Sequence, residues 1–180
     1  ALPAEGWSAQ VRRATVDDAL GAGEALVVAW ERPGLARVTR VVRVGLDGSQ
    51  IVITTSVSCL AEQAITMTDL QPLGAGRLTL GEIRDGDATP TVYVDSGSQG
   101  GTHIARLDES RSCAGICAVY NPVTDRSFVA ANLAFEHDDR VAVAPAEGAI
   151  ELTARTSTAI AIAPGETHEF DPLLLDCRTN

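Results

Sequence analysis

The fold is decided by the run Tyr120-Asn121-Pro122-Val123-Thr124-Asp125-Arg126-Ser127-Phe128-Val129 together with Asp171-Pro172-Leu173-Leu174-Leu175-Asp176. The first run predicts a turn followed by a buried strand, because Asn-Pro interrupts regular structure while Phe128 and Val129 favour a pleated sheet. The second run predicts a closing strand. Several short alternating segments lie between the two. The last third of the chain therefore predicts a scaffold of strands and indicates no chemistry by itself.

An early hairpin is predicted from strict alternation of side chains. In residues 37–44 one face carries Val38, Val42 and Val44 and the other carries Arg37, Thr39 and Arg43. This period of two is typical of a half-buried strand. The turn Leu46-Asp47-Gly48-Ser49 leads into residues 51–57, where Ile51, Ile53 and Val57 share a face with Cys59. Asp-Gly between two alternating runs is a strong hairpin signal.

Strands are expected along the whole chain, separated by turns rich in Pro, Gly and Asp. Short helical turns are expected only at residues 16–20 and 60–64. The remaining expected strands are residues 7–16, 25–31, 64–70, 77–83, 91–94, 116–120, 127–136, 140–144, 149–155, 159–162 and 169–175. About a dozen short strands predict an all-β fold, a two-sheet antiparallel β-sandwich of the super-sandwich type. Residues 1–180 are expected to form this single β-sandwich domain.

Charge and composition exclude several classes of function. The chain has 180 residues, a net charge of −10 and 45% hydrophobic residues. An acidic chain gains nothing from counterion release at phosphates, so nucleic acid is not an expected partner. No apolar run reaches the roughly 20 residues that span a bilayer, so no membrane span is expected. A carbohydrate partner, a protein partner and a homo-oligomer remain open.

The four cysteines are predicted to form disulfides, with free core thiols as the alternative. We predict the pairs Cys113–Cys117 and Cys59–Cys177, although four cysteines allow other connectivities. Gly115 lets the chain turn back between the first pair. Cys59 and Cys177 each share parity with the apolar face of a strand. Disulfides imply an oxidising compartment, so a secreted or extracytoplasmic protein is expected.

The segment after Cys117 resembles the N-terminal β-sandwich of α-galactosidase (melibiase-like) glycoside hydrolases. The matching residues are the turn 120–126 and the strand Phe128-Val129-Ala130-Ala131-Asn132-Leu133-Ala134-Phe135-Glu136. The family's closing strand is matched by Pro164-Gly165-Glu166 and residues 171–176. The resemblance also includes the early hairpin and covers about two thirds of the chain.

The resemblance implies a scaffold without the family's catalytic machinery. In that family the hydrolytic carboxylates belong to a (β/α)8 barrel that follows the sandwich. Here no alternation of strand and helix predicts a barrel before Asn180. The family's catalytic residues therefore match no position of this chain.

The polar residues form no constellation that predicts catalysis, a cofactor or a metal. Acidic clusters occur at Asp85/Asp87, Asp108/Glu109 and Glu136/Asp138/Asp139, and solvated turns explain them better than a glycosidase pair or a calcium site. His103, His137 and His168 share no short motif, and Ser96, Ser98 and Ser112 lie in no nucleophile elbow. The Cys113–Cys117 spacing differs from a redox CxxC, which favours a structural cross-link.

Aromatic residues are scarce, and two of them are candidates for ligand contact. Trp7 and Tyr93 are flanked by polar residues, whereas Trp30 follows Val27-Val28-Ala29 and is expected in the core. Packing is the competing interpretation for Trp7.

The leading hypothesis is therefore a non-catalytic secreted β-sandwich module with a carbohydrate-associated or protein-interaction role. One alternative is a structural or assembly subunit of a surface layer, filament or virion. Another is a fragment or subunit of an α-galactosidase-like glycosidase.

Overall fold

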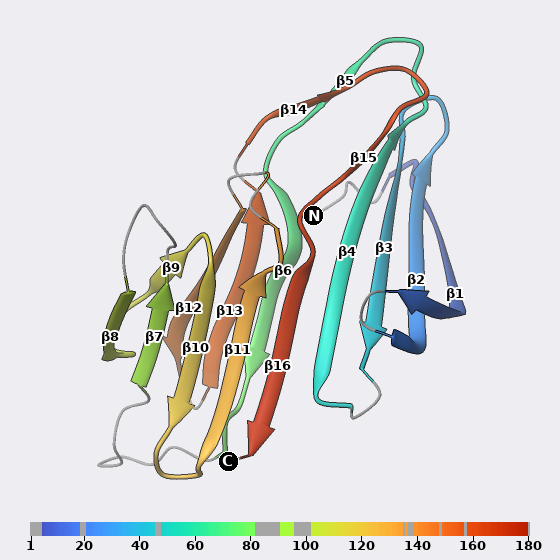
Figure 1. The fold of residues 1–180 in the computed structure, drawn as a ribbon. Helices are drawn as coiled ribbons and strands as arrows, with labels where there is room; N and C mark the ends of the chain where they lie inside the picture. Colours follow the sequence, from blue (N-terminus) through green and yellow to red (C-terminus); the bar gives the residue numbers. More distant parts are fainter. Residues whose placement is uncertain are drawn as a thin grey trace.

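A computed structural model describes residues 5–18, 21–45, 48–81, 91–95, 102–134, 136, 139–147, 149–156 and 158–179. These residues form strands and connecting turns and contain no helix (Figure 1). The strands are β1 (Ser8–Asp18), β2 (Gly21–Arg32), β3 (Ala36–Val44), β4 (Gln50–Cys59), β5 (Ile65–Met67), β6 (Leu70–Leu78), β7 (Thr91–Asp95), β8 (Thr102–Arg106), β9 (Arg111–Cys113), β10 (Ile116–Asn121), β11 (Arg126–Asn132), β12 (Asp139–Ala146), β13 (Ala149–Thr156), β14 (Ile160–Ile162), β15 (Thr167–Glu169) and β16 (Leu173–Thr179).

The strands form two packed layers and a small arm. The large sheet has ten strands in the order β1-β2-β3-β4-β16-β11-β10-β7-β8, with β15 also pairing with β4. The second sheet has the order β6-β13-β12-β9, and β14 pairs with β5 in the arm. Figure 1 shows the four-stranded sheet behind β16, β11 and β10, and the arm beyond the ends of both sheets. The predicted antiparallel β-sandwich is confirmed, with more strands than the dozen expected.

The early hairpin forms as its alternation predicts. β3 and β4 pair in continuous register from Ala36↔Cys59 to Val44↔Ile51. Ile53, Val57 and Cys59 are buried on one face of β4, as predicted. Gly48 has a φ of 73°, and its N–H donates to the carbonyl of Gly45 at 2.9 Å. A positive φ is available to Gly at no steric cost, which explains the residue at this turn.

The turn between β10 and β11 also forms where the sequence predicts it. The Asn121 carboxamide accepts a hydrogen bond from the N–H of Val123 at 2.9 Å and donates one to the carbonyl of Leu80 at 3.2 Å. The hydroxyl of Tyr120 donates to the Asp125 carboxylate at 3.0 Å, which raises the pKa of Tyr120. Side chains of the turn therefore satisfy its backbone and hold the hairpin closed.

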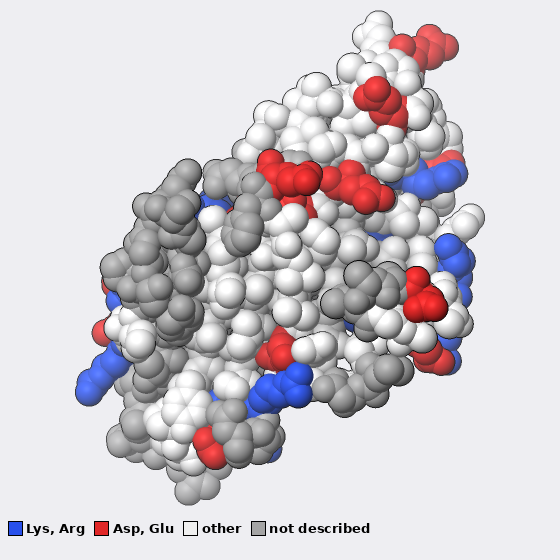
Figure 2. Space-filling model, in the orientation of Figure 1, with Lys and Arg blue, Asp and Glu red and all other residues white. Residues whose placement is uncertain are grey.

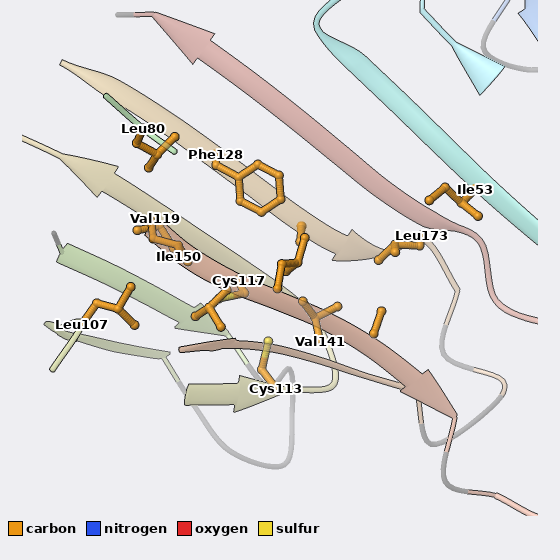
Figure 3. Packing of buried hydrophobic residues seen from close by; sticks show 14 residues of the cluster. Ile53, Leu80, Leu107, Cys113, Cys117, Val119, Phe128, Val141, Ile150 and Leu173 are labelled. Atoms are coloured by element: carbon orange, nitrogen blue, oxygen red, sulfur yellow. The ribbon is translucent and has the colours of Figure 1, made fainter. Parts of the chain in front are cut away.

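The main hydrophobic core fills the space between the two sheets (Figure 3). Val119, Phe128 and Leu173 come from the large sheet, and Val141 and Ile150 from the small one. All five are at most 2% exposed. Burial of such side chains contributes about 1.5–3 kcal/mol each, so this cluster is the main source of stability.

A second core lies under the arm. Val38, Val57, Cys59, Ile162 and Phe170 form it, and Trp7, Trp30, Met67 and Leu70 pack against it. Trp30 thus lies at the edge of a core, as predicted. The arm β5–β14 closes the end of the large sheet that the four-stranded sheet does not cover.

Two local predictions are wrong. Residues 16–18 end β1 instead of starting a helical turn, because β1 pairs with β2 from Ser8↔Glu31 to Asp18↔Gly21. Residues 19 and 20 lie outside the described part. Residues 61–63 form a bend, and the N–H of Leu60 donates to the carbonyl of Leu35 at 3.0 Å. Long-range pairing overrides the weak local helix preference at both places.

Strand boundaries also differ from the prediction. The closing strand expected at 169–175 is divided into β15 and β16, because Phe170–Pro172 leaves the sheet and Pro172 has no N–H to donate. Pro72, Gly74 and Gly76 lie inside β6, where a turn was expected. β6 is an edge strand with two register shifts against β13, and such strands tolerate Pro and Gly.

Candidate ligand groove

A hollow with a mixed polar and apolar lining lies on the outer face of the large sheet, away from the four-stranded sheet. Its cavity has a volume of about 340 Å³. It spans β3, β4 and β15 and the two segments that follow β11 and β15. The lining residues are Thr39, Val41, Thr54, Thr55, Ser56, Ala134, Glu136, Glu169, Phe170, Asp171 and Pro172.

A second hollow of about 340 Å³ lies on the same face, over β1, β2 and β3. Its lining residues are Ser8, Gln10, Arg12, Val27, Ala29, Glu31, Arg37 and Thr39. Thr39 lines both hollows, so the two hollows are neighbours on the outer face. We call this surface the outer groove.

The register of the sheet explains why polar side chains meet there. Thr39 faces Ala29 on one side and Ser56 on the other, and Ser56 faces Glu169 on β15. Residues directly opposite in an antiparallel pair point to the same face. The core takes Val38 and Val57 from the neighbouring positions, which leaves the hydroxyls and Glu169 on the outer face.

Carboxylates concentrate at one end of the outer groove. Glu136 and Glu169 are exposed, whereas Asp171 is only 4% exposed and accepts a hydrogen bond from the N–H of Glu136 at 3.2 Å. Figure 2 shows acidic side chains, in red, gathered between the end of β11 and β15. This end of the groove therefore disfavours anionic ligands by direct repulsion.

The opposite end carries one net positive charge, because Arg12 adds to the ion pair of Arg37 and Glu31. The Nε of Arg37 donates to the Glu31 carboxylate at 2.7 Å, and Ser8 donates to the Glu31 carbonyl at 3.3 Å. Exposed Arg12 adds a positive charge. Twelve of the eighteen described lining residues have side chains that can donate or accept hydrogen bonds, and the other six are apolar. Phe170 is the single aromatic among them and is buried. Such a surface suits a ligand rich in hydroxyl groups more than a flat apolar one.

Trp7, one of the two aromatic residues predicted for ligand contact, is not among the described residues that line the groove. Trp7 is half-buried against the second core, with its indole N–H buried. Tyr93 lies on β7, and its side chain is outside the described part. Trp7 therefore packs, which is the competing interpretation.

Within the described residues, the other polar clusters form no common site. Asp108 and Glu109 pair with Arg111 at 3.7 and 2.8 Å as an exposed turn. Asp85, Asp87, Asp138, His137, Ser96, Ser98 and the side chain of His103 fall outside the described residues. His168 contacts Phe170 edge-on at 5.0 Å, and Ser112 is exposed on β9. Across the described residues, no three His, Cys, Asp or Glu side chains are grouped to hold a metal ion.

The cysteine prediction needs correction at one pair. Cys59 is the last residue of β4, whereas the N–H of Cys177 donates to the carbonyl of Ser49, before the first residue of β4. The two ends of this strand are roughly 30 Å apart, and a disulfide needs Cα atoms within about 7 Å. The Cys59–Cys177 pairing is therefore wrong. Shared parity gave the face of each cysteine but not its position along the strand.

Cys113 and Cys117 do lie together. Their side chains are hydrogen-bonded, and both are fully buried in the main core. None of the four cysteines forms a disulfide in this structure. Reasoning from sequence missed the groove residues Thr39, Thr54, Ser56 and Glu169. The hydroxyls of Thr39, Thr54 and Ser56 alternate with the apolar face of the hairpin, and this alternation could have indicated those three residues but not Glu169.

Comparison with solved structures supports the fold. A GH36 α-galactosidase from Geobacillus stearothermophilus superimposes with a TM-score of 0.63 at 10% identity, covering 96% of this chain and 27% of that chain. The galactosidase domain of an α-galactosidase-sucrose kinase gives 0.61 at 9% identity, with the same coverages. A putative aldose 1-epimerase from Escherichia coli K12 gives 0.55 at 12% identity, covering 94% and 69%.

These likenesses show a shared fold, and they agree with the α-galactosidase sandwich that the sequence resembles. This chain spans about a quarter of the length of the α-galactosidase chains it matches. No protein-family model matches the chain, and no curated protein matches it. Among the described residues no helix is long and apolar enough to cross a membrane.

Proposed function

We propose that this protein is a non-catalytic carbohydrate-binding module whose ligand lies in the outer groove. The observation that carries the proposal is the lining of the groove by the hydroxyls of Thr39, Thr54 and Ser56 beside the Glu169 carboxylate. Sugar hydroxyls donate and accept hydrogen bonds with such groups. Two solved structures with this fold are named an α-galactosidase and a putative aldose 1-epimerase, and these names support the same class of ligand.

The ligand is proposed to be a neutral saccharide of about two sugar residues. Each hollow has the volume of a small ligand site, and Thr39 lines both. Carboxylates at one end repel uronic acids. The described lining residues offer no exposed aromatic platform. Binding therefore depends on hydrogen bonds between protein and sugar, which replace hydrogen bonds to water with a small net gain. We therefore expect a weak dissociation constant of about 1 mM.

Isothermal titration with a neutral galactose disaccharide tests the proposal. Thr54→Val removes one groove hydroxyl with little change in shape, and we expect it to weaken binding about five-fold. The matched control is Thr66→Val on the exposed arm, which should leave binding unchanged. Glu169→Gln is a second test variant, because Glu169 lines the groove, and Glu151→Gln is its control outside the groove. Equal effects of the groove and control variants would refute the groove as the site.

Assembly through a second copy of the chain is the other candidate function. The core-side face of β1–β3 extends beyond the four-stranded sheet and exposes Val11 (63%), Leu26 (41%) and Val44 (43%). Exposed apolar side chains grouped on one face are typical of interaction sites. Light scattering on a sizing column tests this function. A dimer that Leu26→Asp converts to a monomer would support it, and a monomer at all concentrations would exclude it.

Secretion is part of the proposal and depends on oxidation of the cysteines. Extracytoplasmic proteins keep structural disulfides, whereas cytosolic thiols stay reduced. Peptide mapping of protein purified from its native host, with thiols blocked at lysis, tests the compartment. A cross-linked pair would support an oxidising compartment, and four blocked thiols would contradict it.

A further inference from the structure

Two buried cysteines lie on different sheets of the sandwich. Cys113 is the last residue of β9, the edge strand of the four-stranded sheet, where it faces Val141. Cys117 is the second residue of β10 in the large sheet, where it faces Ala130. Only three residues separate them. The chain thus crosses from one layer to the other within this short connection.

The two thiol groups are in contact inside the main core. A side-chain hydrogen bond joins Cys113 and Cys117, and both residues have no exposed surface. Figure 3 shows them within the same cluster as Val141 and Leu107. A sulfur–sulfur bond forms when these interacting sulfur atoms approach to about 2.05 Å.

The connection between the two cysteines is held in place by Asn132. Its side-chain amide donates to the carbonyl of Ala114 at 2.8 Å and to that of Asp139 at 2.9 Å. Its backbone N–H donates to the carbonyl of Gly115 at 3.2 Å. Asn132 is itself only 7% exposed. Asn132 therefore holds the backbone of the short connection, residues 114 and 115, in the position that keeps the two thiols together.

We propose that Cys113 and Cys117 form a covalent modification site, where an oxidant of the disulfide class joins the two sheets. The reaction forms one sulfur–sulfur bond and releases two protons and two electrons from the thiols. The oxidant's own disulfide takes up those electrons and leaves as two thiols. The site is independent of whether the outer groove binds a sugar.

The disulfide forms while the chain is folding, and the folded protein does not form it. Thiolate is the attacking species, and the hydrogen bond that the Cys117 thiol donates to Cys113, together with burial, raises the pKa of Cys117 well above its ordinary range. Both thiols are also closed to solvent. Oxidation therefore requires an open chain, and the folded core then shields the bond from reductants. Cys177 is exposed and serves as an internal reference for accessible thiols.

The test is to refold the full chain with glutathione disulfide or with a reductant, and to alkylate the thiols after denaturation. Cleavage after Arg gives one peptide, residues 112–126, that contains both cysteines and no other. After oxidative refolding we expect this peptide without alkyl groups and lighter by two hydrogen atoms. After reductive refolding it should carry two alkyl groups. Folded reduced protein exposed to the same oxidant should change only at Cys177.

Thermal unfolding supplies a second readout. Oxidative refolding should raise the Tm by about 5 °C, as expected for closing a short loop. Cys177→Ser should keep that rise, and Cys113→Ser should abolish it. Cys113→Ser can also fail to fold, but the wild-type peptide result stands without it. A doubly alkylated peptide after oxidative refolding, or the bond between Cys177 and another cysteine, would overturn the proposal.

Discussion

The guanidinium carbon of Arg40 lies over the indole ring of Trp30, 5.5 Å from its centroid. The same side chain donates to the carbonyl of Gln71 on β6 at 3.0 Å. Arg40 therefore ties β3 of the large sheet to the edge of the four-stranded sheet, at the boundary between the two cores. Partial burial lowers its pKa, although a guanidinium stays charged at any physiological pH.

Arg40→Ala is expected to lower the free energy of unfolding by about 2–3 kcal/mol. It removes a stacked cation, leaves the Gln71 carbonyl without this donor and opens space beside Trp30. Arg37 on the same strand is the matched control. It forms an exposed ion pair with Glu31, so Arg37→Ala should cost less than about 1 kcal/mol. Urea denaturation measures both, and equal costs would show that Arg40 has no structural role.

Leu173→Ala is expected to cost about 2–5 kcal/mol of stability, because Leu173 is 1% exposed within the main core. Leu133 provides the matched comparison, since it carries the same side chain at 46% exposure. Leu133→Ala should change stability by about 0.5 kcal/mol or less. Chemical denaturation of the two variants checks the placement of the core between the sheets. The placement is wrong if Leu133→Ala is the more costly change.

Cys177 is expected to react slowly with alkylating reagents despite its exposure. Partial burial first, and the Asp176 carboxylate second, raise the pKa of this thiol. A raised pKa means less thiolate at a given pH, so the rate should rise with pH and reach its midpoint above the ordinary value of about 8.5. Asp176→Asn removes the repelling charge and should move that midpoint down. A midpoint at or below the value of free cysteine would contradict this environment.

Much of the fold follows from local patterns in the sequence. The strict alternation of residues 37–44 and 51–57 predicted β3, β4 and their buried face, and the Asn121-Pro122 turn predicted the β10–β11 hairpin. The four-stranded sheet was harder to predict. β9 has three residues, and β6 contains a proline and glycines that normally indicate a turn. Such strands are stabilised by pairing with neighbouring strands and not by the intrinsic β propensity of their residues.

The outer groove could not be predicted, because it depends on which strands become neighbours. Thr39 and Ser56 could be paired from the hairpin alone. Glu169 and Glu136 join them only because β15 pairs with β4 and the chain leaving β11 passes alongside. The same limit explains the error at Cys59 and Cys177. Side-chain parity gives the face of a sheet, whereas the distance along a strand depends on the register of pairing.

The central claim is that the outer groove holds a neutral saccharide, and backbone amide NMR tests it most directly. Titration of the labelled protein with a neutral galactose disaccharide should shift the amide signals of Thr39, Thr54 and Ser56. It should leave Ser112 on β9 unchanged. The corresponding galacturonate disaccharide should cause smaller shifts at equal concentration, since Glu169 and Glu136 repel it. Absence of shifts at about 10 mM sugar, roughly ten times the expected dissociation constant, or shifts confined to residues outside the groove, would contradict the account.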